Sequence, residues 1–233
     1  MRPVGYHHKT PDGTSRARRG AGIVTLNARW LTMNKFVAAI LCIVVLGSVA
    51  QPSKAQVAWD APALMSPASP SGLSILLFDA HPGDELGVMA MWRNSQAPAG
   101  LGFRVGLADD PGGDLAVMAG IDFSASLARL DGAGDPSVLW WTGAGIGAGD
   151  EFLASFPLGL VFGWRGSSEG VVFLPYAGGH ATLDVFTGPG DDLDIEASVD
   201  LGVDVGWSSG FMARFGASIG GRDAFAIGVR LPG

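Results

Sequence analysis

Residues 193–208 of this 233-residue chain alternate without interruption between apolar side chains and polar or small ones. The polar positions include four acids: Asp194, Glu196, Asp200 and Asp204. Successive side chains of an extended strand point to opposite faces, so the stretch predicts a long strand with one apolar and one polar face. A helical period fails, because steps of three or four residues would mix the acids into the apolar stripe.

Turn-forming segments recur along the chain after residue 72. The chain has 36 glycines and 14 prolines, and links such as DDPGGD and GPGDD reverse the chain direction. Between these links we predict strands at 73–80, 85–93, 101–108, 115–130, 138–148, 152–166, 171–187, 193–208, 210–221 and 224–231. Short links join antiparallel neighbours, because parallel strands need long crossovers. We therefore expect one all-β antiparallel domain over residues 73–233, with ten strands, or eight if weak segments merge.

Residues 33–55 have the organisation of a secretory signal peptide. A lysine near a methionine is followed by an apolar run, and small residues precede a cleavage site that we expect after Ala55. A retained anchor helix is the alternative, although the run is shorter than the roughly 20 residues that a spanning helix needs. Residues 1–32 would then be an upstream extension, or Met33 is the true start.

Residues 56–72, which follow the expected cleavage site, contain three prolines among alanines and serines. This composition indicates a flexible lead-in to the β domain. The single cysteine, Cys42, lies in the apolar run, so the exported chain has no thiol and no disulfide framework. We predict no cofactor.

The charge after Lys54 is strongly acidic, because seven arginines and no lysine stand against 21 acids. This balance argues against nucleic acid or anionic lipid headgroups as partners. Five of the seven arginines fall on the polar side of predicted strands: Arg93, Arg104, Arg165, Arg214 and Arg230.

A two-faced sheet can close with its apolar face inside, as a soluble barrel, or outside against lipid, as a transmembrane barrel. The apolar rows are long enough for a tilted spanning strand, which needs about 9–11 residues. Aromatic residues stand near strand ends, where interfacial girdles are expected: Trp92, Trp164, Trp207, Phe211 and Phe225. We therefore predict an up-and-down transmembrane barrel of 8–10 strands. A soluble secreted or periplasmic barrel that binds a small apolar ligand is the alternative.

The predicted signal peptide, the Gly-rich antiparallel strands, the alternation through residues 193–231 and the tight turns resemble the small outer-membrane β-barrel proteins of Gram-negative bacteria. The resemblance covers most of residues 73–233 and is one of pattern. It implies a non-enzymatic integral outer-membrane protein with an envelope structural role or a narrow pore. It implies outer-membrane lipid and the outer-membrane assembly machinery as partners, and leaves the oligomeric state open.

Inward polar faces would bring many charges together in the lumen. The predicted lumen charge network comprises Arg93, Arg104, Asp122, Arg165, Asp184, Asp194, Glu196, Asp200, Asp204, Arg214 and Arg230. The lumen of a barrel of eight to ten strands is about as wide as its side chains, so these groups would pack as a salt-bridged plug. The functional alternative is a narrow cation-favouring pore lined by excess carboxylate.

The segment HPGD follows an apolar strand and is similar to the AHPDDE metal-binding turn of zinc-dependent N-acetylglucosaminyl deacetylases, with His81 and Asp84 at ligand positions. A glycine replaces the general-base acid, and His180 is the only other histidine of the exported chain, whereas catalytic zinc normally has three protein ligands. We therefore interpret HPGD as a β-turn and predict no metal site. The acids at 109–114 and 190–194 are likewise interpreted as turn residues rather than calcium ligands.

Overall fold

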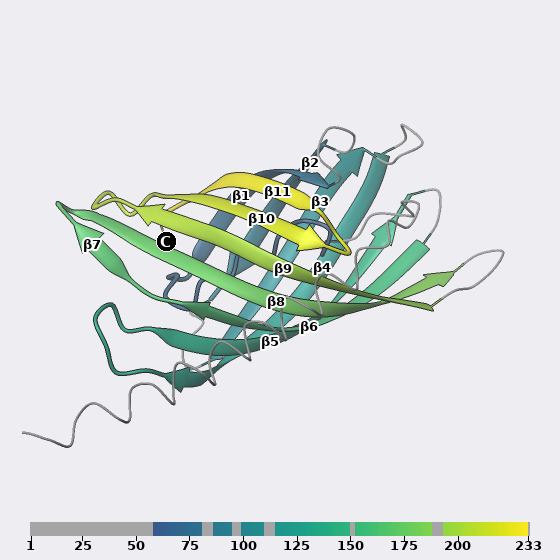
Figure 1. Cartoon of the computed structure of the whole chain (residues 1–233). Helices are drawn as coiled ribbons and strands as arrows, with labels where there is room; N and C mark the ends of the chain where they lie inside the picture. Colours follow the sequence, from purple (N-terminus) through teal and green to yellow (C-terminus); the bar gives the residue numbers. More distant parts are fainter. Residues whose placement is uncertain are drawn as a thin grey trace, which may run out of the picture. The chain divides into compact units, whose positions relative to one another are not determined.

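Hydrogen bonds between neighbouring strands run around the whole molecule and close one antiparallel sheet on itself (Figure 1). The computed structural model describes residues 58–80, 86–94, 99–109, 115–149, 152–187 and 193–232. The described strands are β1 Gly72–Ala80, β2 Leu86–Arg93, β3 Ala99–Asp109, β4 Leu115–Arg129, β5 Ser137–Ala148, β6 Phe152–Gly163, β7 Gly166–Ser168, β8 Val171–Thr187, β9 Leu193–Gly206, β10 Met212–Gly220 and β11 Ala224–Arg230. No described helix is long and apolar enough to cross a membrane.

Two pairings between strands that are not consecutive in the chain close the barrel. The first strand, β1, pairs with the last, β11, and β6 pairs directly with β8. The short β7 pairs only with β8 and stands outside the ring, so ten strands form the barrel wall. The predicted all-β up-and-down barrel is confirmed, with ten strands rather than eight.

The predicted strand limits agree with the structure within two residues at all but one end. The exception is the predicted strand 152–166, in which β6 already ends at Gly163 and the short β7 follows. The predicted signal peptide and the residues before it lie outside the described residues.

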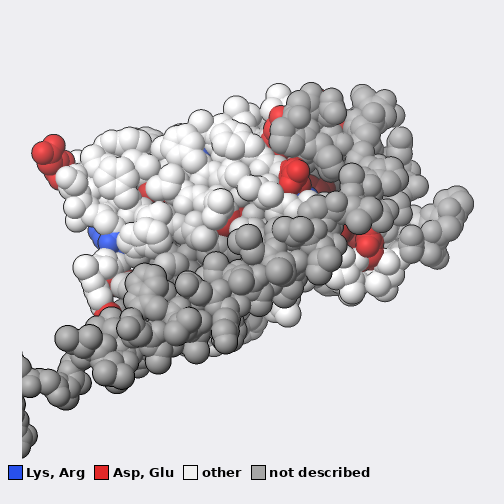
Figure 2. Space-filling view, in the orientation of Figure 1, with Lys and Arg blue, Asp and Glu red and all other residues white. Residues whose placement is uncertain are grey.

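The apolar rows point outward, as predicted for a transmembrane barrel. On β9, Leu201 is 46% exposed, whereas the alternating Asp200 and Asp204 are 1% and 0% exposed. The same alternation of exposed and buried residues runs through β3, β6 and β11. Figure 2 shows the result, because most of the described wall seen there is uncharged and charged atoms gather toward its ends. A soluble barrel would require the opposite assignment of faces.

The two ends of the barrel differ in their outward aromatic residues. We call the end at which β1 begins and β11 ends the proximal mouth, and the opposite end the distal mouth. Trp92 and Trp140 lie on the outward faces of β2 and β5 near the proximal mouth, and the exposed Trp164 and Trp207 directly follow β6 and β9 there. Tryptophan favours the boundary between membrane and water, so this ring marks one interface of the bilayer.

Leu201 provides a test of the lipid-facing assignment. Leu201→Arg is expected to lower the free energy of unfolding by about 2–4 kcal/mol, since this position lies well inside β9 and a cation there would meet acyl chains. Leu193→Arg, at the distal end of the same strand, is the matched control and is expected to cost about 0–1 kcal/mol. Denaturant unfolding in lipid vesicles measures both values, and equal losses would contradict the assignment.

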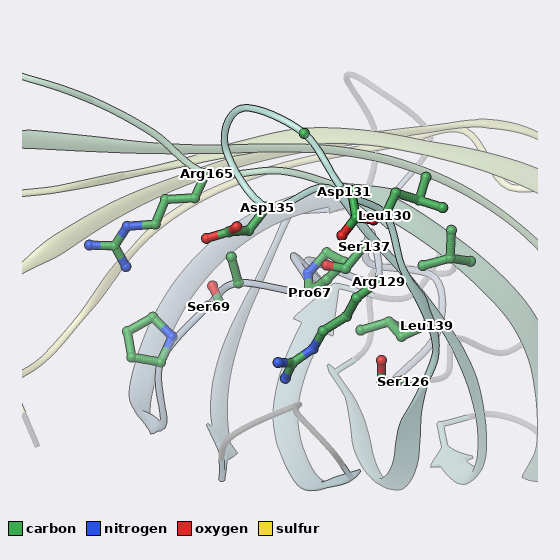
Figure 3. A pocket seen from close by; sticks show the side chains of 14 residues that line it. Pro67, Ser69, Ser126, Arg129, Leu130, Asp131, Asp135, Ser137, Leu139 and Arg165 are labelled. Atoms are coloured by element: carbon green, nitrogen blue, oxygen red, sulfur yellow. The ribbon is translucent and has the colours of Figure 1, made fainter.

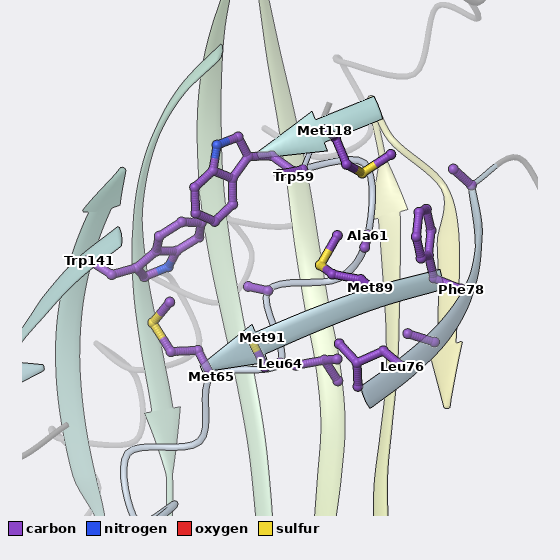
Figure 4. Packing of buried hydrophobic residues seen from close by; sticks show 14 of the residues in the cluster. Trp59, Ala61, Leu64, Met65, Leu76, Phe78, Met89, Met91, Met118 and Trp141 are labelled. Carbon is purple, nitrogen blue, oxygen red and sulfur yellow. The ribbon is translucent and has the colours of Figure 1, made fainter. Parts of the chain in front are cut away.

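Parts of β1 and β2 are apolar on both faces, although Ser74 and Arg93 of these strands also point inward. Leu76 and Phe78 of β1 and Met89 and Met91 of β2 point inward and are at most 1% exposed. Their partners in the lumen come from the chain segment that precedes β1 (Figure 4). The inner surface of the barrel is therefore only partly polar.

Candidate functional site: the barrel lumen

The lumen contains residues 58–70 of the chain itself, a segment that we call the strap. Trp59 is 3% exposed, and Leu64 and Met65 are 0% exposed. Residues 56–72 were predicted to form a flexible lead-in, but the structure buries most of the strap inside the barrel. The reason is that the wall supplies both apolar contacts for its side chains and hydrogen-bond partners for its backbone.

Apolar contacts hold the amino-terminal part of the strap. The indole of Trp59 lies 5.4 Å from that of Trp141 on β5, in a tilted arrangement that is favourable for aromatic pairs. Around this pair, Figure 4 shows Met89 and Met118 from the wall together with Leu64 from the strap. The strap thus completes a dry core inside the barrel.

Wall glycines make room for the strap. A Cβ atom on Gly145 would lie 2.5 Å from Nε1 of Trp59, and one on Gly143 would lie 2.7 Å from the same ring. On the other side of the lumen, a Cβ on Gly216 would lie 2.5 Å from Leu64. These glycines therefore provide the space into which the two large strap side chains fit.

Two wall arginines hold the strap backbone. Arg104 donates to the carbonyl oxygens of Ala58, at 3.2 Å, and Ala63, at 3.1 Å, while its guanidinium lies 4.1 Å from the Trp59 ring centroid. Arg214 donates to the carbonyl oxygen of Leu64 at 2.6 Å. Backbone carbonyls buried in the lumen therefore have charged donors, which makes these hydrogen bonds stronger than neutral ones.

Asp204 organises the proximal half of the lumen. Its carboxylate accepts two hydrogen bonds from Arg214, at 3.0 and 3.1 Å, and one from the hydroxyl of Ser69 in the strap. Arg214 also donates to Ser74 on β1 at 3.2 Å. One buried ion pair thus ties β9, β10, β1 and the strap together.

A second charge group joins β2, β3 and β4. Arg93 lies 2.6 Å from the carboxylate of Asp122, and Arg104 lies 3.9 Å from the same carboxylate. Gly102 faces Asp122, and a Cβ at that position would lie 2.5 Å from the carboxylate. These three charges were all predicted for the lumen, and the structure brings them together.

The most connected charge of the lumen, Arg222, was missed by the sequence analysis. Its guanidinium reaches Asp60 of the strap at 2.8 Å, Glu196 at 2.7 Å, and Asp184. Burial alone would lower the pKa of Arg222, but these three carboxylates raise it above its ordinary value. The group therefore stays charged. Arg222 lies in the β10–β11 turn, and the alternation of side chains along a strand cannot predict which way a turn residue points.

His180 also lies in the lumen, although it is not among the residues predicted there. Its Nδ1 lies 2.9 Å from the carboxylate of Asp200, and its ring packs 5.5 Å from Trp141. Asp200 also accepts a hydrogen bond from the backbone N–H of Ala63 in the strap, at 3.4 Å. The sequence could have placed it there, because His180 and Asp184 are four residues apart on β8 and therefore point to the same face of the sheet, and Asp184 was a predicted inward residue.

The remaining predicted charges have different outcomes. Arg230 is 8% exposed and donates to the backbone carbonyls of Ser71 and Gly210 near the proximal mouth. Asp194 is half-buried and accepts a local hydrogen bond from the N–H of Ile195. Arg165 is exposed and does not belong to the lumen, because β6 ends two residues before it and the parity argument no longer applies.

The proximal mouth holds a cavity of about 600 Å³ beside the end of the strap (Figure 3). Arg129 and Arg165 line it, together with Asp131, Asp135 and strap residues Pro67 to Pro70. The loop between β4 and β5 is fixed here, since the N–H of Arg165 donates to Gly134 at 2.7 Å. Neither arginine takes part in the buried ion pairs around Asp122, Asp204 and Arg222.

Gly202 tests how tightly the lumen is packed. A Cβ there would overlap the hydroxyl of Tyr176 and lie 2.6 Å from the carbonyl oxygen of Phe215. Gly202→Ala is expected to cost about 1–3 kcal/mol of unfolding free energy, because the wall cannot yield without moving the backbone. Gly166→Ala, whose Cβ would have no neighbour nearer than 3.9 Å, is the control and should cost less than about 0.5 kcal/mol.

The HPGD segment with His81 and Asp84 lies outside the described residues, and so does most of the two acid clusters at 109–114 and 190–194. Among the described residues, no group of three or more potential ligands could hold a metal ion. The one histidine in the described part of the chain, His180, faces Asp200 in the lumen.

No protein-family model matches the chain, and no curated protein sequence matches it. Among solved structures, the KdgM porin in complex with disordered oligogalacturonate is 11% identical, with 68% of this chain and 97% of that chain covered and a TM-score of 0.37. The β domain of the Bordetella autotransporter BrkA is 15% identical, with coverages of 71% and 100% and a TM-score of 0.40. LpxR from Salmonella typhimurium is 12% identical, with coverages of 76% and 85% and a TM-score of 0.37.

The closed ring of ten strands and the outward apolar rows carry the assignment. The chain folds as a small β-barrel of the outer-membrane type. Its lumen is filled rather than open.

Proposed function

We propose that the protein is an integral barrel of the bacterial outer membrane that keeps its lumen closed with its own strap and serves the envelope as a structural protein. The observation that carries the proposal is the buried strap. Trp59, Leu64 and Met65 fill the lumen, and Arg104 and Arg214 hold the strap backbone.

The exterior supports insertion into a lipid bilayer. Its exposed side chains include long rows of leucine, valine, isoleucine and phenylalanine, which would be costly to hydrate. The outer-membrane lipid and the assembly machinery that inserts such barrels are accordingly the proposed partners. Export by the predicted signal peptide belongs to the same proposal.

The interior supports a closed state. The inward carboxylates Asp122, Asp184 and Asp204 all have arginine partners at ion-pair distance. An ion crossing the lumen would have to displace the strap or separate these buried pairs, and breaking one such pair costs about 3–5 kcal/mol. A steady ion current is therefore not expected.

A narrow pore is the second candidate. The described contacts of the strap with the wall are hydrogen bonds, ion pairs and apolar contacts, which can break reversibly. The cavity at the proximal mouth also leaves space beside Pro67 and Pro70. A pore would then require release of the strap.

Fractionation and conductance together test the proposal. The full exported chain is expected in detergent-extracted outer membrane, with a gel mobility that changes on heating, and it should give no steady current in planar bilayers. A variant lacking residues 58–70, if it retains the heat-dependent mobility, should conduct. Recovery in the soluble periplasmic fraction would contradict the membrane assignment, and a steady current through the full chain would contradict the closed state.

A further inference from the structure

The cavity at the proximal mouth carries charged side chains of both signs that stay apart from one another. Arg129 and Arg165 line it, and so do Asp131 and Asp135. Figure 3 shows the four side chains arranged around one space. No ion pair between described residues involves any of the four, whereas the carboxylates deeper in the lumen have arginine partners. Their charges are therefore available to a ligand.

A β-bulge turns Arg129 toward the cavity. The register of β4 on β5 shifts after Ser126, where Leu127 is the extra residue, and Arg129 pairs with Ser137. Ser137 lies on the same face of β5 as the buried Leu139, while Leu127 is 61% exposed on the outer side. In a regular strand Arg129 would lie on the face opposite to Ser126, toward lipid. Bulges beside functional sites re-aim side chains in this way.

The β4–β5 loop, which carries the two aspartates, is held in place by its backbone. The N–H of Leu130 donates to the carbonyl oxygen of Pro136 at 2.8 Å, and the N–H of Arg165 donates to Gly134 at 2.7 Å. Asp135 has a φ of 49°, in the left-handed region that residues other than glycine seldom adopt. A loop fixed in this way holds its carboxylates ready for a ligand, which lowers the cost of binding.

The cavity is large enough for a small molecule. Its volume of about 600 Å³ lies in the range of about 300–1,000 Å³ that is typical of ligand sites. A second hollow of about 530 Å³ shares Asp135 and Arg165 with it and extends the site toward Trp164. Pro67 of the strap and Leu139 add apolar surface to the lining. The site therefore has room for a short chain rather than a single small ion.

The mixture of charges selects the class of ligand. A purely anionic molecule would be repelled by the aspartates, and a purely cationic one by the arginines. Guanidinium groups bind a carboxylate or phosphate through paired hydrogen bonds, and carboxylates accept hydrogen bonds from ammonium groups. We infer that the proximal mouth binds a small zwitterion, such as a short peptide, whose anionic group meets the two arginines and whose ammonium group meets the two aspartates. This binding activity goes beyond the proposed structural role and requires only the folded barrel.

Calorimetric titration of the purified, detergent-solubilised exported chain tests the inference. The probes are trialanine, its N-acetylated form, which lacks the ammonium group, and its C-terminal amide, which lacks the carboxylate. Trialanine is expected to bind, and each blocked form should bind at least about tenfold more weakly, because one charged hydrogen-bonding group is lost. A fourth probe is glycerophosphoethanolamine, the soluble headgroup of a zwitterionic lipid. Its binding in place of trialanine would support the zwitterion site and identify lipid as the source of the ligand.

Two variants assign the ends of the ligand. Arg129→Gln should weaken trialanine binding about tenfold and leave the affinity for the C-terminal amide unchanged, because the amide has no carboxylate to lose. Asp135→Asn should weaken trialanine binding and leave the affinity for the N-acetylated form unchanged, and asparagine tolerates the positive φ at this position. Glu169→Gln removes an exposed acid from the β7–β8 turn, outside the cavity, and is the matched control that should change no affinity. Each variant is first shown to keep the heat-dependent gel mobility of a folded barrel.

Three results would overturn the inference: equal affinities for trialanine and its two blocked forms, an equal loss of binding in Glu169→Gln, or no binding of either trialanine or glycerophosphoethanolamine. Failure of the proposed function is a separate outcome. A folded barrel that does not fractionate with the outer membrane, yet binds the zwitterionic probes with this pattern, would contradict the structural role in the envelope and support the binding site.

Discussion

Replacing Arg222 with leucine is expected to lower the free energy of unfolding of the barrel by about 3–5 kcal/mol. The guanidinium stands among three carboxylates, those of Asp60, Asp184 and Glu196. Leucine would leave these acids together at the distal mouth without a counter-charge, and their mutual repulsion would add to the cost of burying Asp184. Denaturant unfolding of the purified protein in lipid vesicles, followed by tryptophan fluorescence, measures the loss.

Arg165→Leu provides the matched control for Arg222→Leu. The side chain of Arg165 is exposed and forms no ion pair with a described residue, so its removal should change the unfolding free energy by no more than about 0.5 kcal/mol. Arg222→Lys should recover part of the loss, since an ammonium keeps the charge but cannot reach three carboxylates at once. Equal stabilities of Arg222→Leu and Arg165→Leu would show that the triple pairing contributes nothing.

The fold could be predicted because each lipid-facing strand repeats the same two-residue pattern. Leu201 and Asp200 differ so strongly in polarity that a slip of one residue would expose the acid to lipid, and this fixes the face of every strand with similar alternation. The aromatic residues at strand ends gave further support. Strand order then followed from short links, which allow only antiparallel neighbours.

The filled lumen could not be predicted, because strand periodicity carries no information about a segment that forms no strand. Residues 58–70 are rich in alanine, serine and proline, and by composition they are typical of a flexible linker. Only the inward apolar residues of β1 and β2 pointed to something inside the barrel. Leu76 and Met91 face a lumen that would otherwise hold water, which means that an apolar partner was required.

The candidate charge network was predicted wherever a strand continued through the charged residue. Arg104, Asp122 and Arg214 lie well inside their strands, and all three are buried as expected. Arg165 and Arg222 lie in links between strands, where the alternation of a strand no longer decides which way a side chain points. The first was expected inside and is exposed, whereas the second is the most connected charge of the lumen.

Replacing Trp59 with alanine is expected to cost about 3–5 kcal/mol of unfolding free energy and to open a leak through the barrel. The indole fills the space provided by Gly143 and Gly145, packs on Trp141 and lies under the guanidinium of Arg104. Alanine would leave a cavity beside the charged groups of the lumen, and water entering that cavity would weaken the hydrogen bonds that Arg104 makes to the strap. Unfolding in vesicles measures the stability, and planar-bilayer recording should show brief current steps that the unmodified chain lacks.

Trp207→Ala is the control for Trp59→Ala, because it removes a tryptophan side chain from the outer surface instead of from the lumen. Trp207 is 48% exposed beside the proximal mouth, so its loss should cost about 1 kcal/mol or less and should produce no current. Trp141→Ala combined with Trp59→Ala should cost about 0.5–1.5 kcal/mol less than the two single losses added together, because the stacking of the two rings is lost only once. A stable and silent Trp59→Ala barrel would mean that the strap does not close the lumen.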